Sequence, residues 1–118
     1  MLTLLAALVL TVSGPPAAYV DTGHAHVPLA LDGWCWSSRC GAPIAPSRRT
    51  ATVARGTLVR CVVGFAPAHA TLTVAGRTVP ASVRGNVVTW RAAAGGGFSL
   101  RVDARPGWVI YVGRLALH

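Results

Sequence analysis

The stretch FSLRVDARPGWVIYVGRLAL, residues 98–117, decides the fold class of this chain. In its first half the large apolar side chains Phe98, Leu100 and Val102 alternate with polar ones. A period of two is typical of a β-strand that has one buried side and one solvent-facing side. The turn signal Arg-Pro-Gly at 105–107 then leads into a second apolar run. The stretch therefore predicts a β-hairpin of two long strands.

Strand-like runs continue upstream of this hairpin, separated by Gly, Pro or Asn at intervals of roughly eight to twelve residues. That spacing is typical of an all-β sandwich or barrel. After residue 18, no run has the 3.6-residue apolar period that an amphipathic helix shows. The expected strands cover residues 27–36, 50–54, 57–65, 70–74, 77–83, 87–91, 98–104 and 108–117.

The length and charge of the chain limit the functions that it can have. Its 118 residues are enough for one domain, which excludes an enzyme with separate cofactor and substrate domains. The chain has eleven Arg and no Lys, three Asp and no Glu, and a net charge of +8. Much acid–base catalysis needs paired carboxylates, and three Asp far apart in the sequence do not supply them. We therefore expect no enzyme activity, no catalytic residues and no cofactor.

The N-terminal segment has the features of an export signal. Residues 2–12 read LTLLAALVLTV and carry no charge, and Ser-Gly-Pro-Pro at 13–16 then breaks any helix. This length fits the apolar region of a signal peptide and is shorter than the roughly 20 residues that span a bilayer. We expect residues 1–18 to be a signal peptide, with an uncleaved membrane-proximal leader or a buried N-terminal helix or strand as the alternatives. Residues 19–26 are expected to be a linker.

The cysteines also point to export. Cys35 and Cys40 enclose Trp-Ser-Ser-Arg, a loop short enough to end a hairpin with the two Cα atoms roughly 5–6 Å apart, as a disulfide requires. Small exported domains often need such cross-links; two reduced core cysteines are the alternative. A zinc site would need a second pair of ligands at suitable spacing, which the sequence lacks. Cys61 lies within an apolar run and is expected to be a buried, free thiol.

Three segments together resemble a known group of proteins. They are GWCWSSRC at 33–40, VARGTLV at 53–59, and GFSLRVDARPG at 97–107 followed by Tyr111, Leu115 and Leu117. In this order they resemble small exported proteins of high-GC Gram-positive bacteria, which open with a Cys-Trp-Ser-Ser loop closed by a second Cys and continue as an immunoglobulin-like sandwich. The resemblance covers residues 29–117. It implies secretion or a place in the cell envelope, and it brings no catalytic residue because the group has no established activity.

The pattern and the resemblance together predict an all-β, immunoglobulin-like β-sandwich of about seven strands over residues 27–118. One departure from the group concerns Phe98, which stands where such strands often carry Tyr. At that position no phenol is available for the hydrogen bond of a tyrosine corner.

Arginines supply the candidate binding surface. Because alternate residues of a strand face opposite ways, four arginines are expected to face away from the core. These are Arg60, Arg91, Arg101 and Arg114. An ordinary solvated face is the alternative, since the apolar stem of Arg can lie on the protein while its head stays in water.

These observations favour an exported, non-enzymatic binding module of the cell envelope, whose partner is an unknown envelope protein or an anionic polymer. The alternative is a basic protein that binds polyanions such as wall polymer, anionic lipid or nucleic acid, although no specific nucleic-acid motif is present. A small metal or redox protein is a third reading, for which His24 and His26 or Cys61 and His69 would supply ligands. We expect no metal site. Membrane contact is expected only through the leader, if it is not cleaved.

Overall fold

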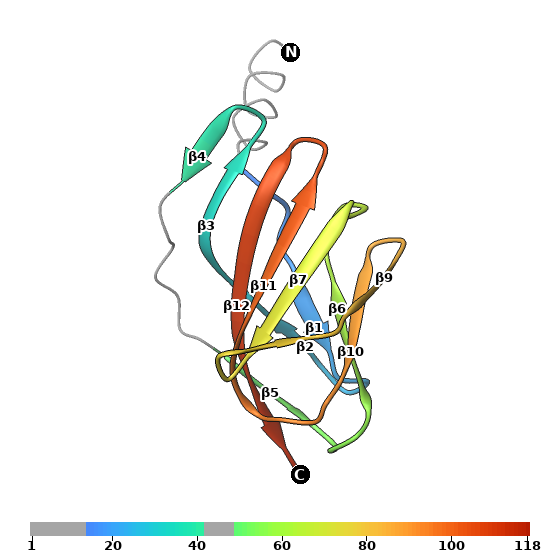
Figure 1. Cartoon of the computed structure of the whole chain (residues 1–118). Coiled ribbons are helices and arrows are strands. Elements are labelled where there is room, and N and C mark those ends of the chain that lie inside the picture. The colour runs from blue at the N-terminus through green and yellow to red at the C-terminus, as the bar shows by residue number, and fades with distance from the viewer. Residues whose placement is uncertain (1–13, 42–48) are drawn as a thin grey trace, which may run out of the picture.

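Two β-sheets packed face to face make up the described part of the chain, as Figure 1 shows. The computed structural model describes residues 14–41 and 49–118, and this part of the chain contains no helix. The predicted all-β sandwich is confirmed, with twelve strands rather than about seven. The strands are β1 (Tyr19–Asp21), β2 (His26–Pro28), β3 (Ala30–Trp36), β4 (Arg39–Gly41), β5 (Thr50–Val53), β6 (Leu58–Val62), β7 (His69–Val74), β8 (Arg77–Val79), β9 (Ser82–Arg84), β10 (Val87–Arg91), β11 (Gly96–Ala104) and β12 (Gly107–Leu117).

The strand order agrees with the predicted immunoglobulin-like sandwich. One sheet has the order β2-β1-β6-β10-β9, and the other has the order β4-β3-β12-β11-β7-β8, with β5 paired to β12 as a seventh strand. All pairings are antiparallel except that of β5 with β12. The orders β1-β6-β10-β9 and β12-β11-β7-β8 correspond to the A-B-E-D and G-F-C-C′ orders of an immunoglobulin sandwich. The β3–β4 hairpin is an addition beside β12.

Two of the expected strands are each divided because the chain changes sheets within them. The run 27–36 becomes β2 in the five-stranded sheet and β3 in the seven-stranded sheet, with Leu29 between them donating its N–H to the Ala18 carbonyl at 2.9 Å. The run 77–83 becomes β8 and β9. Pro80 lies between these two strands, and proline has no N–H with which to continue a ladder.

The prediction of a linker at 19–26 is wrong for Tyr19–Asp21, which form β1, and for His26, which begins β2. Strand β1 lies between β2 and β6, and Val20 is fully buried. Ala18 is also buried, so the expected leader boundary at residue 18 falls inside the packed structure. The apolar run at 2–12 lies outside the described residues.

A buried phenol joins the N-terminal segment to the end of the chain. Tyr111 of β12 is fully buried, and its hydroxyl donates a hydrogen bond to the Pro16 carbonyl at 2.5 Å. Burial, with a smaller contribution from nearby Cys61, raises the pKa of Tyr111, so the hydroxyl remains protonated as a donor. Phe98 packs on Trp90 with ring centroids 5.4 Å apart. A tyrosine on β12 thus makes the backbone hydrogen bond that Phe98 cannot make.

The core lies between the sheets and follows the predicted alternation. In β6 and β11 every second side chain is buried, and their outward neighbours are exposed or half-buried. Phe65 is only half-buried and packs on Trp36 with ring centroids 4.8 Å apart. The largest fully buried side chains are Tyr111, Leu72, Leu100, Val20, Val59, Val63, Val88, Val102, Val109 and Cys61.

The Tyr111 hydrogen bond gives a test of how firmly the N-terminal segment is held. Tyr111→Phe keeps the ring and leaves the partly buried Pro16 carbonyl without its donor, so we expect the free energy of unfolding to fall by about 1 kcal/mol. Denaturant unfolding followed by tryptophan fluorescence measures this change. Tyr19→Phe is the matched control, since within the described residues the Tyr19 hydroxyl donates no hydrogen bond. Equal stability of the two variants would contradict the assignment.

Candidate functional site

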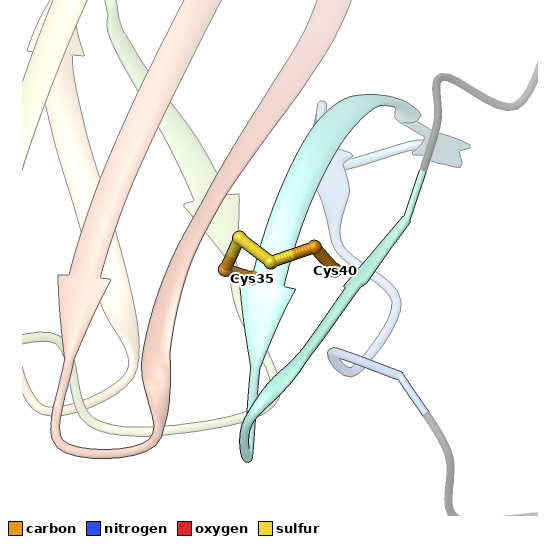
Figure 2. The surroundings of a disulfide bond; sticks show 2 residues. All are labelled: Cys35 and Cys40. Carbon is orange, nitrogen blue, oxygen red and sulfur yellow. A yellow bond between two sulfur atoms is a disulfide. The ribbon is translucent and has the colours of Figure 1, made fainter.

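The predicted disulfide is present and crosses a hairpin, as Figure 2 shows. Cys35 of β3 lies directly opposite Cys40 of β4, with the Cα atoms 3.9 Å apart rather than the expected 5–6 Å or so. Trp36 and Arg39 flank the two-residue turn and form the first cross-strand pair of the hairpin, and Cys35 and Cys40 form the second pair. In such a hairpin this second pair is not hydrogen-bonded, and its Cα atoms are the closer ones.

The disulfide hairpin is held against the β11–β12 turn, beside which it lies in Figure 1. Ser37 and Ser38 form its tip with φ of 50° and 65°, a conformation that favours glycine. The Ser37 N–H donates to the Pro106 carbonyl at 2.9 Å. A Cβ at Gly107 would overlap the Cys35 carbonyl, so only glycine permits this close approach. These contacts and the disulfide give the hairpin a structural role.

The four candidate arginines do not form one surface. Arg60 and Arg91 lie on the outer face of the five-stranded sheet, whereas Arg101 and Arg114 lie on the outer face of the seven-stranded sheet. The outer faces of a sandwich point in opposite directions, so the two pairs of arginine side chains point away from each other. The prediction that they form a single binding surface is therefore wrong.

On the seven-stranded sheet the charge of Arg101 is already partnered. Its Nη2 lies 3.3 Å from Asp103 Oδ1, and its guanidinium lies over the Trp108 ring, 5.0 Å from the centroid. The Arg101 and Asp103 side chains are 48% and 38% exposed, so this ion pair adds little to stability. Its neighbours reduce the capacity of Arg101 to attract an external anion.

The five-stranded sheet has an open groove on its outer face. The groove has a volume of about 550 Å³ and runs over β6, β10 and β9. It contains the Leu58 side chain, which is 56% exposed. Val83 of β9 also borders the groove, but its side chain lies on the inner side of the sheet with its partner Val88. Arginines supply the charge of the groove. The lining residues are Leu58, Arg60, Ser82, Val83, Arg84, Val87 and Thr89.

Sequence reasoning found Arg60 and missed the rest of this groove. The expected strand 77–83 ends at Val83, and Arg84 lies outside every expected strand. The Gly-Asn dipeptide at 85–86 is the signal that could have found them, since a two-residue turn there pairs Arg84 with Val87.

The groove has an excess of positive charge. Arg60 and Arg84 make no ion pair with any described residue. Arg91, at one end of the same face, donates to the Gly56 carbonyl at 2.7 Å and keeps its charge. Asp21 lies opposite Arg60 across β1 and β6, and its Oδ1 accepts from the Gly23 N–H at 2.9 Å. Three arginines and one aspartate give this face a net charge that favours an anionic partner.

The residues considered as metal ligands are separated in the fold. Within residues 14–41 and 49–118, no three His, Cys, Asp or Glu side chains lie close enough to hold a metal ion. His26 stacks on Tyr19 with ring centroids 4.3 Å apart, and His69 forms a hydrogen bond with Thr71 at 3.3 Å. Cys61 is fully buried, and burial raises the pKa of its thiol from 9.0 to about 12.

Comparison with known proteins gives no relative for this chain. No family model, no curated protein and no solved structure matches it. The described part of the chain has no helix with the length and hydropathy needed to cross a membrane. The groove is therefore interpreted from its own geometry and chemistry.

The thiols provide a test of the cysteine assignment. Without reductant, a thiol reagent should label no cysteine of the folded protein near neutral pH, because Cys35 and Cys40 are bonded and Cys61 is buried. One thiol should become reactive in denaturant. Mass spectrometry counts the labels; two or three labels in denaturant would show that the disulfide is absent.

The raised pKa of Cys61 predicts a loss of stability in alkali. Between pH 9 and about 12 the unfolded thiol ionises while the buried one stays protonated, so the free energy of unfolding should fall as the pH rises. Cys61→Ala should reduce this slope by up to about 1.4 kcal/mol per pH unit. Tyr111, whose pKa is also raised, should account for the slope that remains. Equal slopes for the variant and the wild type would contradict the burial of the thiol.

Proposed function

We propose that this chain is an exported, non-enzymatic binding module of the cell envelope, which holds its partner against the outer face of the five-stranded sheet. One observation carries the proposal: the outward apolar side chains of Leu58 and Val87 line the same groove as Arg60 and Arg84. Single exposed apolar residues are common, whereas several in one groove beside charged residues are typical of an interaction site.

The composition of the groove favours binding over catalysis. Its lining consists of apolar side chains, two hydroxyls and two arginines. Arginine stays protonated, and no His, Cys or carboxylate lines the groove to act as a base or to activate a nucleophile. Apolar and guanidinium groups are instead the usual centre of protein interfaces.

Three features support export. The apolar run at 2–12 has the length of a signal-peptide core. Disulfides such as Cys35–Cys40 persist in oxidising compartments and are uncommon in cytosolic proteins. The segments at 33–40, 53–59 and 97–107 resemble exported proteins of high-GC Gram-positive bacteria. On this basis the partner is an envelope protein or polymer.

The partner is expected to carry negative charge. The predicted arginines are divided between two faces, but Arg84 joins Arg60 and Arg91 on the face that bears the groove. Charge alone would attract any polyanion, including nucleic acid. The outward apolar side chains of Leu58 and Val87 favour a partner that has apolar groups between its anionic groups.

Sedimentation with isolated cell envelopes of a high-GC Gram-positive bacterium tests this function. Leu58→Ser and Arg60→Ser should each lower the affinity roughly five- to tenfold, as expected for central contacts worth more than about 1 kcal/mol. Arg114→Ser is the matched control, because it removes an exposed arginine from the opposite face. Part of the binding should persist at high salt, since the apolar contact is not screened. An equal loss for Arg114→Ser would reject the groove as the binding site.

A further inference from the structure

We propose that the edge of β9 is the docking position for an extended acidic segment of a partner protein, which adds to the five-stranded sheet as a further strand. This inference rests on the proposed function and names the chemical class of the partner. Strand β9 ends the order β2-β1-β6-β10-β9, so in the described chain no strand lies beyond it.

The backbone of β9 presents free hydrogen-bonding groups at this edge. A two-residue turn at 85–86 joins Arg84 to Val87, and residues that flank such a turn exchange their hydrogen bonds with each other. The next pair, Val83 and Val88, is then not hydrogen-bonded. The Val83 N–H and C=O consequently point away from β10. Among the described residues no turn or loop hydrogen bond uses them, so they can receive an added strand.

The Val83 side chain also lacks a neighbour. It lies on the same side of the sheet as its partner Val88, which is fully buried, yet Val83 is 40% exposed. The exposure arises because β9 is the last strand and leaves one flank of Val83 uncovered. An apolar side chain from an added strand would cover that flank, as cross-strand neighbours do elsewhere in a sheet.

Alternation then determines what the neighbouring residues of the segment must be. Ser82 and Arg84 lie on the outer face, so the partner residues beside them also face outward. Arg84 makes no ion pair among the described residues, and a carboxylate beside it would provide one. The segment should therefore alternate apolar and acidic side chains, with acidic residues roughly 6.8 Å apart along the strand.

A second copy of this chain is a poor occupant. Each copy carries a net charge of +8 and only three Asp, so two copies repel each other. The three Asp lie in β1, β3 and β11, and each of these strands is already paired on both edges. Charge complementarity thus favours a different, acidic polypeptide.

A peptide of alternating valine and glutamate is the probe, and a peptide of the same composition with the two residue types in separate blocks is its control. We expect saturable one-to-one binding of the alternating peptide and at least tenfold weaker binding of the blocked one. Hydrogen exchange of the Val83 amide, followed by NMR, should slow at least tenfold in the complex. Arg84→Glu should weaken binding at least tenfold, while Arg77→Glu on β8 should leave it unchanged.

Val83→Pro removes the outward N–H and should abolish peptide binding, with a thermal melt to show that the variant is folded. If it does not fold, Arg84→Glu and the Val83 amide exchange still test the proposal. Equal binding of the two peptides, no saturable binding, or an unchanged Val83 amide would overturn the proposal.

Envelope binding by the variants separates this proposal from the proposed function. Should Val83→Pro bind envelopes like the wild type while Leu58→Ser does not, the edge is rejected and the proposed function stands. Should Leu58→Ser and Arg60→Ser bind envelopes like the wild type, the proposed function itself fails.

Discussion

The pairing of β12 with three other strands is the constraint on which the rest of the structure depends. β11 follows one edge of β12 from Gly107 to Leu115. Along the other edge β3 pairs first, and β5 continues in the parallel direction to the end of the strand. From the middle of β12, Tyr111 reaches across the core to Pro16. One strand therefore holds the N-terminal segment, the disulfide hairpin and the β11 hairpin in a single arrangement.

The two outer faces of the sandwich differ in how their polar groups are satisfied. On the seven-stranded sheet, Arg101 has Asp103 and the Trp108 ring as neighbours. On the five-stranded sheet, Arg60 and Arg84 have no ion-pair partner within the described residues and share a groove with the exposed Leu58. An arginine with an internal partner gains less from an external anion than one without. The exposed Leu58 beside unpaired arginines, rather than the total charge, is the reason we propose the groove as the binding face.

Changes of sheet produce the short edge strands. The chain changes sheets at Leu29 and again at Pro80–Ala81, and each change leaves a three-residue strand at an edge of the five-stranded sheet. Short edges with Pro and charged residues usually prevent uncontrolled pairing with other chains. The β9 edge has these protective features and yet leaves Val83 partly exposed. Such an edge resists general aggregation and still has room for one short, complementary segment.

Spacing along single segments was enough to predict the fold class, the disulfide pair and the inward side of the long strands. Alternation alone assigned Phe98 and Leu100 to the core. It could not say which sheet a strand joins, since Arg60 and Arg101 follow the same outward pattern on opposite faces. The tertiary structure was needed to bring Arg60 and Arg84 to one groove, because the groove is formed by three strands whose neighbourhood is set by pairing across the sheet.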